Sequence, residues 1–180
     1  MSRRSALVFC HCGIPGCSHC EETKSFNSAV RLFAVNSRVD EENDAFLAST
    51  GNPVARIVAT NTHAMGASFK GSGLYQALKL SIGCRVMLRR NIAVELGLVN
   101  GSLGTVQAIV YEEGAVPPAL PLYVLVKFDS YRGPCLINDL FPIVPISESS
   151  QQILERGQTR QSNTRKQLPL SVAHAITVVF

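Results

Sequence analysis

The sequence predicts an α/β protein in which part of a parallel sheet layer carries an inserted small antiparallel β-barrel. A strand pattern passes directly into a helix pattern over residues 30–47, which is half of an α/β unit. Short β-branched segments separated by turn signals recur over residues 83–146, and this spacing is typical of a small barrel or sandwich. The chain has 180 residues, of which 46% are hydrophobic, and this is enough to bury a core.

The first 25 residues form a Cys/His-rich appendage with no helix or strand periodicity. Zinc binds four thiolate or imidazole donors in a tetrahedron, and the candidate ligands here are Cys10, Cys12, Cys17 and Cys20. Only four residues separate the two cysteine pairs, which is short for a folded zinc module. A free, reducible cysteine cluster and a wrongly assigned start of the reading frame are the alternatives to a zinc site.

Residues 26–80 contain the strand and helix of the α/β unit. A short buried strand is expected at 30–35, and Asn36 and Ser37 are expected to cap a helix with acids in its first turn. An apolar stripe with helical spacing runs along this helix through Val39, Asn43, Phe46 and Leu47. Residues 51–53 end the helix and residues 54–60 predict the next strand, whereas 61–73 read as a loop and 74–80 fit either helix or strand.

The small barrel is expected over residues 81–146. Its predicted strands are 83–88, 105–111, 123–128, 135–137 and 141–146. The first two strands are joined by a loop that closes at Asn100-Gly101, a pair that readily supplies the positive backbone angles of a tight turn.

The first part of the C-terminal third shows no hydrophobic periodicity of a helix or a strand. Residues 147–167 are polar and read as a linker, and residues 168–180 return to an apolar composition that is compatible with a helix, with Pro169 in its first turn. Lys and Arg number 17 against 13 acids, and the resulting charge of +4 permits a nucleic-acid partner without requiring one. No run of eighteen apolar residues occurs, so no membrane span is expected. We expect an intracellular protein.

Three segments, in this order, resemble the Pif/RecD-like branch of superfamily 1 DNA helicases. Residues 31–36 (RLFAVN) and 39–43 (VDEEN) look like the strand and helix that open the second RecA-like domain. Residues 78–128, which include GCRVMLRRN and LVNGSLGTV, look like the small inserted barrel. Residues 166–170 (KQLPL) and 173–177 (AHAIT) look like the return to the RecA-like domain, leading into a motif shared by DNA contact and ATP coupling.

The resemblance implies a partial ATP-dependent helicase that moves 5′ to 3′ on DNA. The chain would supply part of the RecA-like parallel layer (26–80), the barrel (81–146), a linker (147–167) and a truncated return (168–180). ATP and magnesium would be bound mainly by an absent half, single-stranded DNA would be the partner, and no membrane is involved. The family also implies a nuclear or mitochondrial location and roles in DNA repair, recombination and telomere maintenance.

The same resemblance implies which residues contact DNA. Cations near the barrel and the return segment are the candidates for backbone contact, two asparagines are amide donors, and one threonine belongs to the shared motif; these are Arg85, Arg89, Arg90, Lys127, Arg132, Arg165, Lys166, Asn91, Asn100 and Thr177. Such contacts are electrostatic and tolerant of sequence. For any single arginine, solvation without a partner is the alternative, and His174 is expected only to pack against a strand.

The sequence departs from the family in ways that bear on catalysis. No phosphate-binding G-x-x-x-x-G-K-[ST] loop occurs; the close glycines Gly71 and Gly73 follow Lys70 instead of preceding a lysine. In addition, the sequence ends soon after residue 177, before the rest of the shared motif. We therefore expect no ATP hydrolysis by this chain alone. An independent β-barrel module that binds nucleic acid or protein and carries the zinc appendage is the alternative function, and a degenerate product that does not fold stably is a third interpretation.

Overall fold

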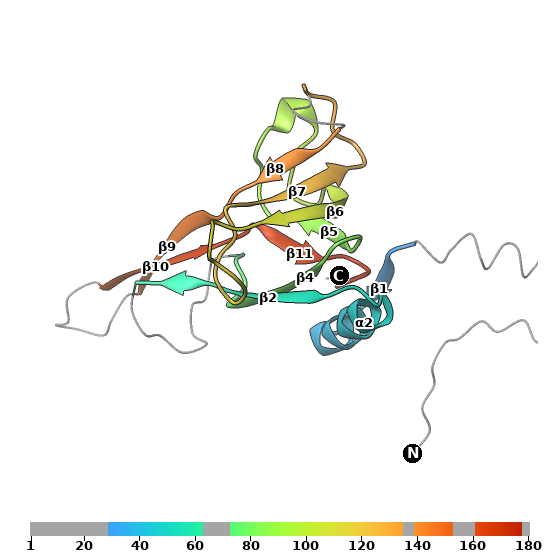
Figure 1. Cartoon of the computed structure of the whole chain (residues 1–180), viewed down its shortest axis with the longest axis horizontal. Helices are drawn as coiled ribbons and strands as arrows, with labels where there is room; N and C mark the ends of the chain where they lie inside the picture. The colour runs from blue at the N-terminus through green and yellow to red at the C-terminus, as the bar shows by residue number, and fades with distance from the viewer. Residues whose placement is uncertain (1–28, 63–72, 135–138, 153–160, 178–180) are drawn as a thin grey trace, which may run out of the picture.

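The computed structural model describes residues 29–62, 73–134, 139–152 and 161–177 (Figure 1). This part of the chain is mostly β-structure with one α-helix. The elements are β1 (Arg31–Phe33), α2 (Asn36–Ser49), β2 (Val54–Val58), β3 (Thr60–Asn61), β4 (Ala77–Ser81), β5 (Arg85–Leu88), the 3-10 helix η1 (Val94–Leu96), β6 (Leu103–Val110), β7 (Tyr123–Phe128), β8 (Phe141–Ile143), β9 (Ile146–Gln152), β10 (Gln161–Gln167), β11 (Leu170–Val172) and β12 (Ala175–Thr177). No helix in this part is long and apolar enough to cross a membrane.

The predicted parallel layer is present only as a pair of strands. β1 pairs in parallel with β12, in a register that places Leu32 opposite Ile176, and α2 packs against both strands. The side chain of Asn43 joins the helix to this pair, because its Nδ2 donates to the Ala175 carbonyl at 3.0 Å and its Oδ1 accepts the Ala175 N–H at 2.8 Å. All other strand pairs in the described ranges are antiparallel, so the predicted α/β class is correct only for this corner of the molecule.

The start of α2 differs from the prediction. Val35 is the N-cap, with extended backbone angles of φ −127° and ψ 127°, and no side chain caps the helix. The chain passes from β1 into the helix one residue earlier than the predicted cap requires, and the acids fall after the first turn. The predicted apolar stripe is confirmed, because Asn43 and Leu47 are the buried residues of the helix.

The segment predicted as a barrel supplies β5, β6, β7 and β8 of a five-stranded antiparallel sheet, and β11, from the predicted return segment, completes the order β11-β5-β6-β7-β8. The strand predicted at 135–137 lies outside the described residues. Alternate residues of its strands, such as Val86, Val106 and Val126, are fully buried on one face. Position 104 on this face requires glycine, because a Cβ there would lie only 2.7 Å from Val126 Cγ1. Within the described residues the end strands β11 and β8 do not pair, so the sheet is open and the predicted closed barrel is not observed.

The predicted turn at Asn100-Gly101 is confirmed. The Ser102 N–H donates to the Val99 carbonyl at 2.9 Å, and Gly101 has φ 96°. Only the glycine has a positive φ, and the loop between β5 and β6 also contains η1, so the turn closes a longer excursion instead of a two-residue hairpin.

The C-terminal third is β-structure where the sequence suggests a linker and a helix. β9 and β10 form an antiparallel pair within residues 146–167, and β3 extends this sheet on the β10 side. β11 then joins the five-stranded sheet and β12 joins β1, so residues 170–177 are two strands and not a helix. In Figure 1 the β9–β10 pair extends to one end of the molecule, and α2 lies under β2 and β4 at the other end.

Candidate nucleic-acid interface

The outer face of the five-stranded sheet collects several of the predicted DNA contacts. In β5 the side chains of Val86 and Leu88 are buried, so Arg85 and Met87, and Arg89 just after the strand, face the opposite way. Arg85 lies opposite Thr105 in β6, and Thr105 lies opposite Lys127 in β7. The sheet therefore places Arg85, Arg89 and Lys127 on one face, which we call the basic face.

Arg85 on the basic face is already paired with an acid. Its Nη1 and Nη2 donate to the two carboxylate oxygens of Asp129 at 2.9 and 2.5 Å, and Nη1 also contacts Thr105 Oγ1 at 3.3 Å. This bidentate pair raises the pKa of Arg85 and lowers the pKa of Asp129, chiefly through the hydrogen bonds between them. A phosphate that binds Arg85 must compete with Asp129, whereas the exposed Lys127 has no ion-pair partner among the described residues.

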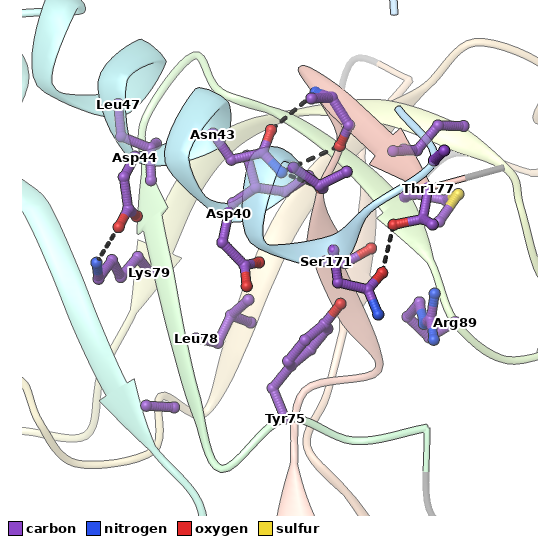
Figure 2. Close-up of a pocket in the computed structure, with 18 residues that line it drawn as sticks. Asp40, Asn43, Asp44, Leu47, Tyr75, Leu78, Lys79, Arg89, Ser171 and Thr177 are labelled. Carbon is purple, nitrogen blue, oxygen red and sulfur yellow. Dashed lines mark hydrogen bonds and ion pairs between the residues drawn. The ribbon is translucent and has the colours of Figure 1, made fainter. Parts of the chain in front are cut away.

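Arg89 lies at the edge of a groove between α2, the basic face and the β1–β12 pair. The guanidinium carbon of Arg89 is 5.9 Å from the ring centroid of Tyr75, which is a cation–π distance. The groove has a volume of about 950 Å³, and Figure 2 shows Asp40 from α2, Tyr75, Ser171 and Thr177 around it. Its lining includes apolar side chains as well, such as Met87 and Ile176.

Thr177 is held at one end of this groove. Its hydroxyl donates to Oδ1 of Asn36, at the start of α2 (Figure 2). Ser171 lies in the groove lining, is 5% exposed, and its hydroxyl has no hydrogen-bond partner among the described residues. The structure thus brings Thr177 and Arg89, two predicted DNA contacts from distant parts of the sequence, to one groove.

Three other predicted contacts lie in or near the β5–β6 loop. Arg90 forms an ion pair with Glu148 of β9, away from the basic face. Asn91 and Asn100 are exposed, and the Asn91 side-chain oxygen accepts the Asn100 backbone N–H at 2.7 Å. These two asparagines stabilise the loop, so only their remaining amide groups are available to a ligand.

Arg132, Arg165 and Lys166 lie outside β5 and β7, the strands that carry Arg85 and Lys127 of the basic face. Arg165 is 6% exposed, and its guanidinium donates to Asn61 Oδ1 at 3.0 Å, the Leu74 carbonyl at 3.1 Å and Gln76 Oε1 at 2.7 Å. Burial lowers its pKa, and these contacts favour a structural role for it. Lys166 and Arg132 are exposed.

Tyr75, Asp40 and Ser171 are site residues that the sequence did not single out. Tyr75 precedes β4 in a stretch that fits helix or strand, so no pattern assigned its ring to a surface. Asp40 was assigned to a helix start, and Ser171 to a helix that is in fact β11. Only Asp40 lies within a segment that resembles the helicase family, so the sequence carried no signal for Tyr75 or Ser171.

The described residues contain no group of three His, Cys, Asp or Glu side chains that could hold a metal ion. Cys10, Cys12, Cys17 and Cys20 lie outside the described residues. The prediction that His174 is a helix residue packed against a strand is wrong, because His174 lies between β11 and β12 and stacks on Phe46 of helix α2 with ring centroids 3.9 Å apart.

The chain resembles one family of helicases both in part of its sequence and in its fold. Residues 70–109 match the family model of the 2B domain of the DNA helicase Pif1. The structure is similar to unliganded Pif1 from Bacteroides sp (TM-score 0.60, 22% identity, covering 84% of this chain and 42% of that chain). It is also similar to Pif1 helicase from Candida albicans (0.61, 23%, 82% and 35%) and to Pif1 helicase from Bacteroides in complex with ADP-AlF3 and ssDNA (0.59, 21%, 82% and 30%). No curated protein sequence matches the chain.

These similarities confirm the predicted resemblance to Pif/RecD-like helicases. The matched residues 70–109 contain β4, β5, η1 and nearly all of β6, and so include Arg85 and Arg89 of the basic face. At these identities the solved structures show a shared fold, and the chain spans less than half the length of each of them.

Proposed function

We propose that this chain, which matches the Pif1 2B domain over residues 70–109 and shares the fold of Pif1 helicases over most of its length, is the single-strand-binding portion of an ATP-dependent DNA helicase. In the intact machine the five-stranded sheet is the inserted barrel, and α2 with the β1–β12 pair is part of the second RecA-like domain. The motor moves 5′ to 3′, and the ATP-binding half is the partner of this chain. The machine works in the nucleus or the mitochondria.

One observation carries the proposal. Three cations from separate strand positions, Arg85, Arg89 and Lys127, lie on one face of the sheet, and two of them belong to the segment that matches the Pif1 2B domain. Cations on one face can follow a phosphate backbone without reading its sequence. One Pif1 helicase of similar fold was solved in complex with ssDNA, which supports the same class of ligand.

The residues present do not fit ATP and magnesium by themselves. The 180-residue sequence has no phosphate-binding loop with its lysine, and the described part has no cluster of acids that could hold a metal ion. The function proposed for the chain is therefore binding, without a catalytic step of its own.

Binding to single strands is tested by the fluorescence anisotropy of labelled oligo-dT of about ten nucleotides, titrated with the full chain at several salt concentrations. Each phosphate contact on a single strand contributes a slope of about −0.7 to the plot of log affinity against log salt. Three cations therefore predict a slope of about −2. Affinity that does not change with salt, or no binding at low salt, contradicts the proposal.

Variants locate the contact surface. Arg89→Gln and Lys127→Gln are each expected to make the slope shallower by about 0.7. The matched control is Arg38→Gln, which removes the same charge from a side chain that is 69% exposed and pairs with Glu41 on α2. An equal effect of all three variants would show that only net charge matters, and the basic face would then not be the binding surface.

The cysteine cluster of the first 25 residues is the remaining candidate for a metal, and zinc is the proposed ion. Metal analysis of the purified chain tests it. One equivalent of zinc that is lost in Cys17→Ser establishes the site, and a metal-free protein with reducible thiols rules it out.

A further inference from the structure

The groove beside the basic face contains two acidic side chains with different surroundings. Asp40 and Asp44 are four residues apart on α2, and both line the groove. Asp44 is neutralised by Lys79, whose Nζ lies 2.7 Å from its carboxylate. Among the described residues no ion pair or hydrogen bond engages Asp40, and Figure 2 shows its carboxylate projecting into the hollow.

An unpaired carboxylate is unsuited to a phosphate and suited to a base. It repels the backbone of a nucleic acid, but it accepts hydrogen bonds from exocyclic amino groups, as acidic side chains do from cytosine N4. Thymine and uracil present a carbonyl oxygen at the same position and would face Asp40 with an unfavourable contact. The carboxylate therefore favours a base edge that carries an amino group.

The other groups in the groove fit the rest of a nucleotide. Tyr75 is 43% exposed and offers a ring surface on which a base can stack, a contact that tolerates any base. Arg89 lies over the same tyrosine and at the edge of the basic face, where it can contact a phosphate. The volume of about 950 Å³ is at the upper end of the range for ligand sites and accommodates one nucleotide unit.

We propose that this groove binds one unstacked base of a single DNA strand and, through Asp40, selects the bases with an exocyclic amino group, cytosine, adenine and guanine, over thymine and uracil. Tyr75 stacks on the base, and Arg89 holds the adjoining phosphate. The inference rests on the proposed function, because it assumes that a single strand follows the basic face. It adds a base preference to binding that is otherwise insensitive to sequence.

The test compares oligo-dC with oligo-dU. Both bases are single-ring pyrimidines, and cytosine carries an amino group where uracil carries a carbonyl oxygen. Anisotropy titrations of the full chain at neutral pH are expected to show about tenfold tighter binding of oligo-dC. Equal affinity for the two strands overturns the inference while leaving the proposed function intact. Failure of both strands to bind contradicts the proposed function itself.

Asp40→Asn and Asp44→Asn form a matched pair, because both remove one negative charge from the same helix face of the groove. Loss of charge alone strengthens the binding of every strand equally. Asp40→Asn is expected to bring the dC/dU affinity ratio close to one, whereas Asp44→Asn keeps the ratio of the unmodified chain. A ratio that survives in Asp40→Asn, or that falls equally in both variants, overturns the role of Asp40.

The stacking step and the source of the base are tested separately. Tyr75→Leu is expected to weaken oligo-dC binding about tenfold and to leave the binding of an abasic strand of equal length unchanged, while Tyr75→Phe retains the affinity.

Free dCMP is expected to compete only weakly with oligo-dC, because it lacks the phosphates that follow the basic face. Competition by dCMP at concentrations comparable to those of the strand would instead make the groove a site for free nucleotides.

Discussion

Arg165 and Lys166 are adjacent on β10, yet their surroundings give them different roles. Arg165 is buried and donates to acceptors from β3 and from the segment before β4, so it ties β10 to both. Lys166 is exposed and faces away from this cluster. Strand alternation separates the two side chains, and this separation follows only from the strand that the sequence did not predict.

Arg165→Gln is expected to lower the free energy of unfolding by about 3 kcal/mol, because the buried Leu74 carbonyl and two part-buried side-chain acceptors lose their donor. Lys166→Gln, the control with the same charge change, is expected to alter it by less than about 0.5 kcal/mol. Urea denaturation followed by circular dichroism measures both. Equal, small effects would show that the hydrogen bonds of Arg165 contribute little to stability.

At the scale of elements, strands with an apolar, β-branched pattern could be predicted, whereas the polar strands β9 and β10 and the short core strand β11 could not. β2, β5, β6 and β7 are rich in β-branched residues, and their sequence patterns indicated strands at nearly the observed bounds. β9 and β10 are polar on both faces, with sequences ISESSQQ and QSNTRKQ, so no hydrophobic period marks them. Their stability comes from a ladder between them and from β3, partners that are distant in sequence.

The candidate site was predictable in part for the same reason. Arg85, Arg89 and Lys127 belong to or adjoin predicted strands, and the strand register brings them to one face. The groove depends on how α2 and β12 pack against that face, which local patterns do not specify. Its Tyr75 and Asp40 were therefore missed, and the paired state of Arg85 and Arg90 could not be foreseen.

His174 links α2 to the turn between β11 and β12, and it makes this junction sensitive to pH. Burial, followed by the nearby Arg31, lowers its pKa from the usual 6.5, and Glu42 opposes this shift. The unfolded chain then binds a proton at a higher pH than the folded chain does. The contribution of His174 to the free energy of unfolding is therefore fully present above pH 6.5. It decreases as the pH falls from 6.5 toward the folded pKa of His174.

His174→Phe is expected to remove this pH dependence, because phenylalanine keeps the stack on Phe46 and cannot be protonated. Urea denaturation between about pH 7 and pH 5 measures the slope. His63→Gln controls for titration of another histidine and is expected to retain it. A slope that persists in His174→Phe would assign the effect to a different group.

In the described part of the molecule, the five-stranded sheet has a fully buried face, whereas residues beside the parallel pair β1–β12 are exposed. The five-stranded sheet closes its inner face with fully buried residues such as Val124 and Leu88. Among the described residues the parallel layer consists of the pair β1–β12, and parallel sheets are normally covered on both faces. Leu32 and Val35 beside it are 63% and 56% exposed, which fits a chain that spans less than half of the Pif1 structures it resembles.

This division predicts the catalytic behaviour of the isolated chain. Phosphoryl transfer requires a cradle that positions the phosphates and charges that stabilise the transition state, and the 180-residue sequence contains no loop of that type. Phosphate-release assays with saturating single-stranded DNA are therefore expected to show no ATP turnover above the background of the buffer. The same preparation must bind oligo-dT, so that the absence of turnover is not a failure to fold. Turnover that copurifies with the chain through successive columns and responds to single strands would contradict this prediction, and the chain would then need a phosphate site built in another way.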